Sequence, residues 1–338
     1  MILITGTTGL VGTHLLAKLL EKTKPEEIRG LYRTQDKKSF CLAVIQRVYG
    51  KTRANLAADI NWQKADINQI PELERCFKNI VYVYHCAGLI SNSPSMLKLL
   101  RKVNIEGTAN VVNLAVDHKV QKLCHVSSIA TLGKSKDHGV VDEESFRENL
   151  NNSSHYSIAK YGGEMEVWRA SQEGLDVVIV NPGIILGEGF YKEGSGALFE
   201  QAASKFPFKI KKITGFVGVK DVADVMILAM LSKVKNQRFI LVEKNTRISN
   251  VQIQIAEKLK TKPPNFQLKK WMLYLYWFFD MLFSKLLGQQ RKLSLDVIPT
   301  LLEDRRYSNE KIESEFNFQF TPIEKVIISC CEDFKKVN

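Results

Sequence analysis

Tyr156 and Lys160 carry a phenol and an amine four residues apart, a spacing that places both side chains on one face of a helix. A nearby ammonium group favours the phenolate and so lowers the pKa of a tyrosine. We therefore expect Tyr156 to exchange protons with a substrate oxygen near neutral pH. Tyr307 and Lys311 repeat the spacing, so the surrounding sequence must distinguish a reactive pair from a structural one.

Two serines upstream of Tyr156 help to make this distinction. Ser127 and Ser128 follow the apolar run 123–126, which predicts a strand. Ligands of open parallel sheets bind at the carboxyl ends of the strands, where a serine hydroxyl can donate to a carbonyl oxygen. One of the two serines can instead cap the loop backbone, which is the commoner role of this residue. We interpret Tyr156, rather than Tyr307, as the reactive tyrosine.

A glycine-rich turn, Thr5–Gly12, joins the first apolar run to the first predicted helix. Gly6 allows a tight turn, Gly9 lets the backbone approach a pyrophosphate, and Gly12 lets the helix pack against the strand. The N-terminus of the helix offers free N–H groups and the positive end of its dipole to phosphates. The strand before the turn and the helix after it favour a dinucleotide-binding turn over a plain glycine-rich one.

The second predicted strand, 28–32, ends at Arg33. A site for NAD(H) usually has a carboxylate here, which accepts hydrogen bonds from the 2′-hydroxyl of the ribose. Arg33 cannot accept such a bond but can pair with a 2′-phosphate, and Lys37 and Lys38 lie just beyond it. We therefore favour NADP(H). The alternative is NAD(H), with Arg33 in solvent and Asp36 on the ribose.

Short apolar runs alternate with amphipathic helical patterns through the first half of the chain. This alternation implies right-handed parallel βαβ units. The predicted fold class is α/β, a Rossmann-type doubly wound parallel sheet. We expect strands at 1–4, 28–32, 81–85, 123–127, 177–180 and 238–242, and helices at 10–20, 97–117, 221–231 and 249–259.

The pattern loosens after Pro182. A chain of 338 residues can hold one large α/β domain and a smaller appended region. We predict a dinucleotide-binding domain of residues 1–183 plus about 214–243. Residues 184–213 and 244–338 would then form the substrate-binding region.

The composition is that of a globular protein with a basic charge balance: 45% of the residues are hydrophobic and the net charge is +12. Excess positive charge favours an anionic partner, such as a phosphorylated cofactor or a membrane surface. Nucleic acid is not expected, because zinc-finger spacing and RNA-binding aromatic motifs are missing from the sequence. The 6 cysteines form no CxxC pair, so we expect reduced thiols. A strand and turn at the very start suggest a cytoplasmic protein without a signal peptide.

Taken in order, these motifs resemble the extended short-chain dehydrogenases/reductases, which form the NAD-dependent epimerase/dehydratase family. Thr5–Gly12 is similar to the TGxxGxxG turn of that family, and Tyr156, Lys160 and an upstream serine are similar to its catalytic set. The resemblance covers nearly the whole chain. Further segments match in order at 65–67, 85–88, 103–108, 180–183, 216–222, 307–311 and 320–322.

The resemblance implies a role for each motif. Ser128, aligned through Gly133, would hold a substrate carbonyl oxygen, and Tyr156 would be the general acid/base. Lys160 would tune Tyr156 and bind the ribose, and Asn104 would anchor a proton-relay water. No metal is expected, because the histidines lack carboxylate partners at ligand spacing. Cofactor contacts are implied for Gly6, Thr8, Gly9, Leu10, Val11, Gly12, Arg33, Asp66, Ile67, Ala87, Gly88, Asn104, Tyr156, Lys160, Pro182, Gly183 and Ile185.

Within the family, Arg33 and the segment 180–183 resemble the dihydroflavonol-4-reductase and 3β-hydroxysteroid dehydrogenase branch, and Leu132 stands where epimerases usually carry a tyrosine. The resemblance implies an oxidoreductase, an NADP(H)-dependent reductase or dehydrogenase of a small or lipid-like ketone/alcohol pair. One alternative is a nucleotide-sugar epimerase or dehydratase with retained NAD. Another is a non-catalytic NADP(H)-binding sensor or assembly protein. The sequence is compatible with a dimer.

The segment 271–287 is rich in Trp, Tyr and Phe and has basic residues on both flanks. It is marginal in length for a bilayer span and contains charge. Two interpretations stay open. It lies in a membrane interface and gives peripheral contact through 269–292, or it is a buried helix that shapes an apolar substrate pocket.

Overall fold

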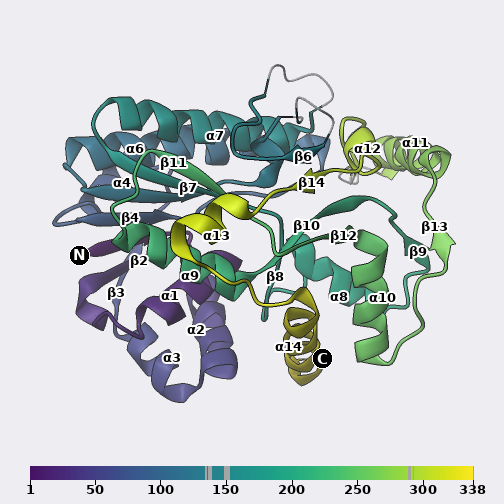
Figure 1. Ribbon diagram of the computed structural model, residues 1–338, viewed down its shortest axis with the longest axis horizontal. Coiled ribbons are helices and arrows are strands. Elements are labelled where there is room, and N and C mark those ends of the chain that lie inside the picture. Colours follow the sequence, from purple (N-terminus) through teal and green to yellow (C-terminus); the bar gives the residue numbers. More distant parts are fainter. Residues whose placement is uncertain (134, 136–138, 148–152, 288–290, 292, 338) are drawn as a thin grey trace.

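Seven parallel strands form the central sheet of the computed structural model, in the order β11-β7-β5-β4-β1-β2-β3 (Figure 1). The order reverses at β1, which pairs with β2 on one side and β4 on the other. The predicted Rossmann-type doubly wound sheet is confirmed. The structure describes residues 1–338 except 134, 136–138, 148–152, 288–290, 292 and 338, and the side chains of 285–287. The strands are β1 Ile2–Thr5, β2 Ile28–Tyr32, β3 Asn61–Lys64, β4 Tyr82–His85, β5 Lys122–Val126, β7 Asp176–Pro182 and β11 Gln237–Leu241.

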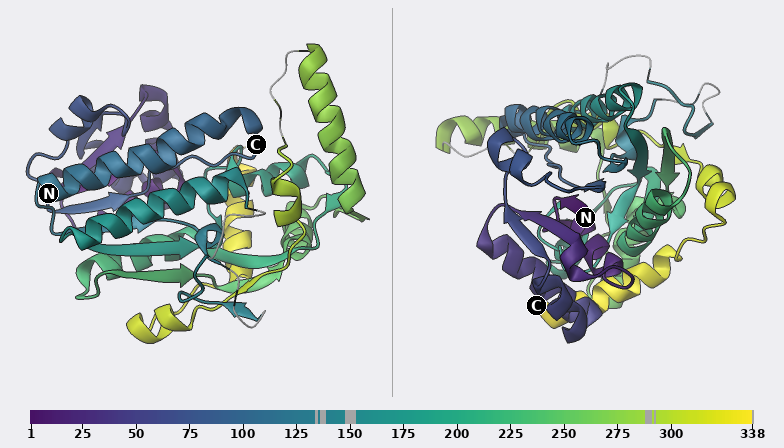
Figure 2. Two further views of the ribbon diagram at one scale, coloured as in Figure 1. Left: turned by 90° about the horizontal axis from the view of Figure 1, so that it is seen from above. Right: turned by 90° about the vertical axis from the view of Figure 1, so that its left-hand side faces the viewer.

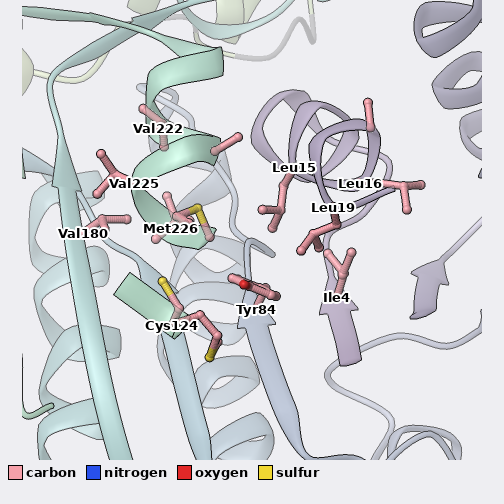
Figure 3. Close-up of a cluster of buried hydrophobic side chains, with 14 of the residues drawn as sticks. Ile4, Leu15, Leu16, Leu19, Tyr84, Cys124, Val180, Val222, Val225 and Met226 are labelled. Carbon is pink, nitrogen blue, oxygen red and sulfur yellow. The ribbon is translucent and has the colours of Figure 1, made fainter. Parts of the chain in front are cut away.

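Helices cover both faces of the sheet because its inner strands are apolar on both sides. Ile4 packs toward Leu15 and Met226 on one face (Figure 3), whereas the preceding Leu3 packs with Val111 on the other. Helices α1 Leu10–Leu19, α2 Gln35–Tyr49, α3 Lys51–Ala58, α9 Val219–Leu231 and α13 Glu310–Phe316 lie on the first face. Helices α4 Ile70–Arg75, α6 Gly107–Asp117 and α7 His155–Gln172 lie on the second.

The predicted helix 97–117 is present but contains one wide turn. α5 (Leu97–Arg101) continues through a π-helical turn, Lys102–Glu106, into α6. The backbone of this turn touches α7, since a Cβ placed on Gly163 would lie 2.1 Å from the carbonyl oxygen of Asn104. The close approach therefore requires glycine at position 163.

A second, smaller sheet follows the point where the sequence pattern loosens. It has the order β12-β10-β8, and its core is built around Phe199 and Phe216. Within 214–243, β10 belongs to this small sheet, whereas α9 and β11 return to the large one. The division into two regions at the predicted boundaries stays a prediction. The elements are β8 Ile184–Leu186, α8 Ala197–Ala203, β10 Ile213–Gly218, β12 Lys244–Arg247, α10 Ile248–Leu259 and α14 Ile323–Val337.

Two short ribbons and one long helix complete the chain. β9 (Phe208–Lys209) pairs with β13 (Phe266–Gln267), and β6 (Val140–Val141) pairs with β14 (Arg306–Tyr307). Helix α11 (Lys270–Leu287) stands away from the body of the molecule in Figure 2, before the short α12, Val297–Thr300. Among the described residues, none of the helices combines the length and the hydropathy that a bilayer span requires.

Phe199 offers a test of the small core, because its side chain is fully buried. We expect Phe199→Ala to lower the free energy of unfolding by about 3–5 kcal/mol, through lost burial and the cavity left behind. Leu231→Ala is the control, since Leu231 is 73% exposed at the end of α9. It should change the free energy by less than about 0.5 kcal/mol. Denaturant unfolding measures both, and equal effects would contradict the assigned core.

Candidate functional site

The predicted site residues gather at one edge of the large sheet. Its strands are parallel, so their carboxyl ends, and the segments that follow them, share that edge. The edge carries residues 6–12 after β1, 33 after β2, 66–67 after β3, 87–88 after β4, 128 after β5, and 182–185 at and after the end of β7. Segments far apart in the sequence thus form one continuous candidate site.

The turn after β1 packs so tightly against neighbouring backbone that side chains at Gly6 and Gly12 would not fit. Gly6 has a φ of +67°, and a Cβ there would lie 2.5 Å from the backbone nitrogen of Ala87. A Cβ on Gly12 would lie 2.2 Å from the carbonyl oxygen of Gly6. Gly9 is exposed, and its N–H closes the turn onto Gly6 at 3.0 Å. The backbone is therefore bare where a phosphate would approach.

The N-terminus of α1 meets this turn. Gly9 is its N-cap residue and offers no side-chain hydrogen bond to the first N–H groups. The partly exposed Thr8, Leu10 and Val11 complete the turn. Uncapped N–H groups and the positive end of the helix dipole suit an anionic group. The residues present here therefore fit the pyrophosphate of a dinucleotide.

Arg33 lies directly after β2, in the exposed position that the sequence predicts. It makes no hydrogen bond or ion pair within the described part of the chain. Lys38 differs, because its ammonium lies 5.4 Å and 5.2 Å from the ring centroids of Tyr32 and Trp62. Asp36 is exposed in the first turn of α2. Arg33, like the exposed Lys37, thus remains available to an anion.

Asp66 and Gly183 lie at opposite ends of the same edge. Asp66 accepts a hydrogen bond from the backbone of Asn68 at 2.9 Å, and Ile67 beside it is buried. A Cβ on Gly183 would lie 2.4 Å from the carbonyl oxygen of Gly215, so the corner after β7 packs tightly on β10. Pro182 is buried, and Ile185 is half-buried.

Tyr156, Lys160 and Ser128 come together at the start of α7. The side chain of Tyr156 lies close to that of Ser128, and the Lys160 ammonium donates to the carbonyl of Val126 at 2.7 Å. Ser128 also accepts from the backbone N–H of Ala130 at 3.1 Å. The backbone-cap role thus falls on Ser128, whereas its role as a substrate donor stays a prediction.

The pKa of Tyr156 differs from our expectation. Burial raises it above its usual value, and the nearby side chain of Ser128 opposes that shift. Burial also lowers the pKa of Lys160 to about 8, although the Glu164 carboxylate works in the other direction. The prediction that Lys160 lowers the pKa of Tyr156 is therefore wrong in this structure. Desolvation of the phenolate dominates, and the ammonium is directed to a backbone carbonyl.

Glu164 is a central residue of the site that the sequence analysis missed. Its fully buried carboxylate accepts hydrogen bonds from Ser127 at 2.5 Å, from Thr131 at 2.7 Å and from Asn181 at 3.0 Å. It also pairs with Arg238 at 3.2 Å. The signal was present, because residues 156, 160 and 164 share one helix face at a spacing of four. Glu164 positions the turn that carries Ser128.

His85 connects the floor of the glycine turn to α6. Its Nδ1 lies 2.7 Å from the hydroxyl of Thr5, and its Nε2 lies 3.0 Å from that of Thr108. Thr108 donates its proton to the Asn104 carbonyl at 2.8 Å. The network therefore assigns the proton of neutral His85 to Nε2, with Thr5 donating to Nδ1. Burial lowers the pKa of His85 to about 3.

Asn104 lies in the site, with its side chain directed to the backbone. Its amide accepts from the N–H of Leu89 at 2.8 Å and donates to the carbonyl of Leu89 at 2.9 Å. A Cβ on the intervening Gly88 would lie 3.4 Å from the Asn104 oxygen and 3.6 Å from the Lys160 ammonium. Asn104 thus holds the Gly88–Leu89 segment beside Lys160, while its role in a proton relay stays a prediction.

Comparison with known proteins agrees with this geometry. The model of the NAD dependent epimerase/dehydratase family matches residues 2–241, and the chain belongs to that family. A putative dihydroflavonol 4-reductase of Synechocystis sp. is 22% identical, over 98% of this chain and 94% of its own length. A UDP-glucose 4-epimerase of Vibrio cholerae is 26% identical, over 84% and 82%. The crystal structure of gox2253 superposes with a TM-score of 0.80 at 22% identity and covers 100% of this chain and 98% of its own.

His125 allows a test of the buried, neutral histidines. Its ring stacks on His85 at 5.0 Å, and neither ring nitrogen has a hydrogen-bond partner among the described residues. Burial holds its pKa well below the usual value. Below pH ~6.5 the unfolded chain therefore binds protons that the folded protein does not, and the free energy of unfolding falls as pH falls. Each such histidine contributes a slope of about 1.4 kcal/mol per pH unit.

We expect His125→Phe to reduce this slope by about 1.4 kcal/mol per pH unit between roughly pH 5 and 6. Stability at neutral pH should be unchanged or higher, because a ring with unpaired nitrogens is replaced by an apolar one. Denaturant unfolding across this pH range measures the slope. An unaltered slope would show that His125 binds its proton equally in both states.

Proposed function

We propose that this protein is an NADP(H)-dependent reductase or dehydrogenase of a small or lipid-like ketone/alcohol pair. The observation that carries the proposal is the proximity of the Tyr156 and Ser128 side chains, with Lys160 one helical turn from Tyr156. Two hydroxyls that converge in this way can both donate to a single carbonyl oxygen. A sensor or assembly protein would have no need of this arrangement.

In the proposed reaction, Ser128 and Tyr156 hold the carbonyl oxygen, and Tyr156 gives it a proton as it becomes an alkoxide. The raised pKa of Tyr156 keeps the phenol protonated before reaction. Lys160, whose ammonium is directed to the Val126 carbonyl, would bind the ribose. A nicotinamide dinucleotide supplies the hydride when bound. The turn at Gly9 would hold its pyrophosphate.

Arg33 supports NADP(H) over NAD(H). It is exposed, directly follows β2 and has no ion pair within the described residues. A guanidinium in that position can bind a 2′-phosphate through charge-assisted hydrogen bonds. A ribose 2′-hydroxyl would need an acceptor instead.

A nucleotide-sugar epimerase is the second candidate, favoured by the likeness to the Vibrio cholerae UDP-glucose 4-epimerase. Leu132 argues against it. This residue, 1% exposed before Gly133, has an aliphatic side chain where such enzymes usually carry a tyrosine. The two functions differ in one observable, because an epimerase regenerates its cofactor in each cycle. Net NADPH oxidation with a panel of ketones and aldehydes supports the reductase, whereas conversion of UDP-glucose without it supports the epimerase.

Tyr156→Phe tests the role of the phenol. We expect the turnover number to fall by about 10²–10⁴-fold, since a general acid contributes that much, while the dissociation constant for NADPH changes less than about twofold. Tyr161→Phe is the matched control on the same helix. The Tyr161 ring lies 5.5 Å from the Arg147 guanidinium, a contact that phenylalanine keeps. Equal turnover in the two variants would contradict the assignment.

Arg33→Glu tests the cofactor preference. Loss of a charge-assisted contact to the 2′-phosphate should raise the KM for NADPH about tenfold or more. The KM for NADH should stay the same or fall, because glutamate can accept from the ribose hydroxyl. Lys22→Glu, an exposed lysine near the far end of α1, controls for the change in net charge. The preference for NADP(H) would be excluded if Arg33→Glu left the NADPH/NADH ratio unaltered.

A further inference from the structure

The solvent side of α11 is apolar. Its inner side packs Leu273 and Trp277 with Leu293 and Ile298 in a small cluster of their own, and Figure 2 shows the helix standing apart from the body. A surface helix normally has the opposite distribution, and a contiguous exposed apolar face marks an interaction site. The large exposed side chains of the described helix are Trp271, Tyr274, Leu275, Tyr276, Phe278, Phe279, Leu282 and Phe283.

This helix keeps its one acidic residue away from the exposed face. Asp280 accepts from the backbone of Leu293 at 3.3 Å, and its carboxylate lies 4.0 Å from the Arg291 guanidinium. The side chain of Asp280 is only 9% exposed. The described apolar face, 271–283, therefore presents neither positive nor negative charge to the solvent, although Lys270 precedes it.

Positive charge gathers where the chain enters α11. Lys262, Lys269 and Lys270 are exposed on this approach. A cavity of about 290 Å³ opens beside Gln267 and Leu268, just before the helix. Its charged lining residues are Lys211, Lys212, Arg247 and one acid, Asp304. Burial, with the Arg305 guanidinium nearby, lowers the pKa of Lys212 to about 8.

We propose that the exposed face of α11 binds the surface of a bilayer that contains anionic lipid. Tryptophan and tyrosine favour the boundary between water and hydrocarbon, and a helix with an aromatic face and basic flanks lies along that boundary. The lysines before the helix are attracted to acidic headgroups. A second copy of this chain, with its net charge of +12, is a poorer electrostatic match. Residues 288–290 and 292 of the predicted membrane segment 269–292 lie outside the described residues.

The segment that follows α11 is bonded to the rim of the candidate site. The backbone N–H of Ser294 donates to the carbonyl of Asn92 at 3.1 Å, and Asp296 accepts from the N–H of His155 at 2.7 Å. His155 directly precedes Tyr156. A bilayer bound to α11 would therefore be linked to the reactive phenol through the short segment that follows the helix. Such a link suits a lipid-like carbonyl substrate. That last point rests on the proposed function, whereas membrane binding does not.

Vesicle co-sedimentation of the full chain tests the docking separately from activity. We expect the wild-type protein to bind phosphatidylcholine vesicles containing phosphatidylglycerol, and to bind pure phosphatidylcholine more weakly. Tyr274→Ser/Phe278→Ser should reduce the partition coefficient at least about tenfold. Leu228→Ser/Leu231→Ser removes two exposed apolar side chains from α9 instead and should leave binding unchanged. Lys269→Glu/Lys270→Glu should weaken binding several-fold, by an amount that shrinks at high salt.

Thermal unfolding shows whether each variant is folded, and Trp271→Ser replaces the α11 double variant if that variant is not. The proposal is overturned if the wild-type protein binds neither kind of vesicle, or if the α11 and α9 variants bind equally. It is also overturned if the wild-type protein sediments as a dimer that Tyr274→Ser/Phe278→Ser separates while vesicles have no effect. That result would assign the face to a second copy of the chain. None of these results depends on whether the protein reduces a ketone.

Discussion

The buried carboxylate of Glu164 is the contact on which the geometry of the site depends. A charge removed from water costs several kcal/mol unless other groups replace the lost hydration. Here Ser127, Thr131, Asn181 and Arg238 provide that replacement from the ends or turns of three neighbouring strands. Because all four donors must reach one carboxylate, the rotation and position of α7 relative to the sheet are fixed. Tyr156 and Lys160, two turns and one turn before Glu164, are thereby brought to the turn that holds Ser128.

Desolvation sets the electrostatics of the site. It raises the pKa of Tyr156 and lowers that of Lys160, so it opposes charge on both members of the pair. The two histidines beneath them follow the same rule. His85 and His125 are stacked and buried close to the Lys160 ammonium, which further disfavours a second positive charge. The hydrogen-bonded chain from Thr5 through His85 to Thr108 therefore holds the glycine turn against α6 without adding charge.

The part of the chain beyond the large sheet follows different constraints. α8, α10 and α14 bury their apolar sides around Phe199 and Phe216 in the ordinary way. α11 buries only a narrow side and leaves its aromatic residues other than Trp277 exposed. The sequence left two interpretations of this segment open, a helix that lines a pocket and a helix that lies in a membrane interface, and its hydrophobicity fits both. Periodicity could not decide between them, because α11 is apolar nearly all round and only its packing shows which side is covered.

The sequence by itself determined the local parts of this protein. The glycine turn, the alternation of strands and helices and the 156/160 spacing each depend on residues that are neighbours along the chain, so periodicity and turn chemistry reveal them. β3 escaped prediction because Asn61–Lys64 is a polar, half-exposed edge strand, and α2 because so few of its side chains are buried. Only the tertiary structure decided that Glu164 meets Arg238 and that burial outweighs Lys160 in setting the pKa of Tyr156. Those outcomes depend on contacts between distant segments and on the solvent they exclude, and one-dimensional spacing records neither.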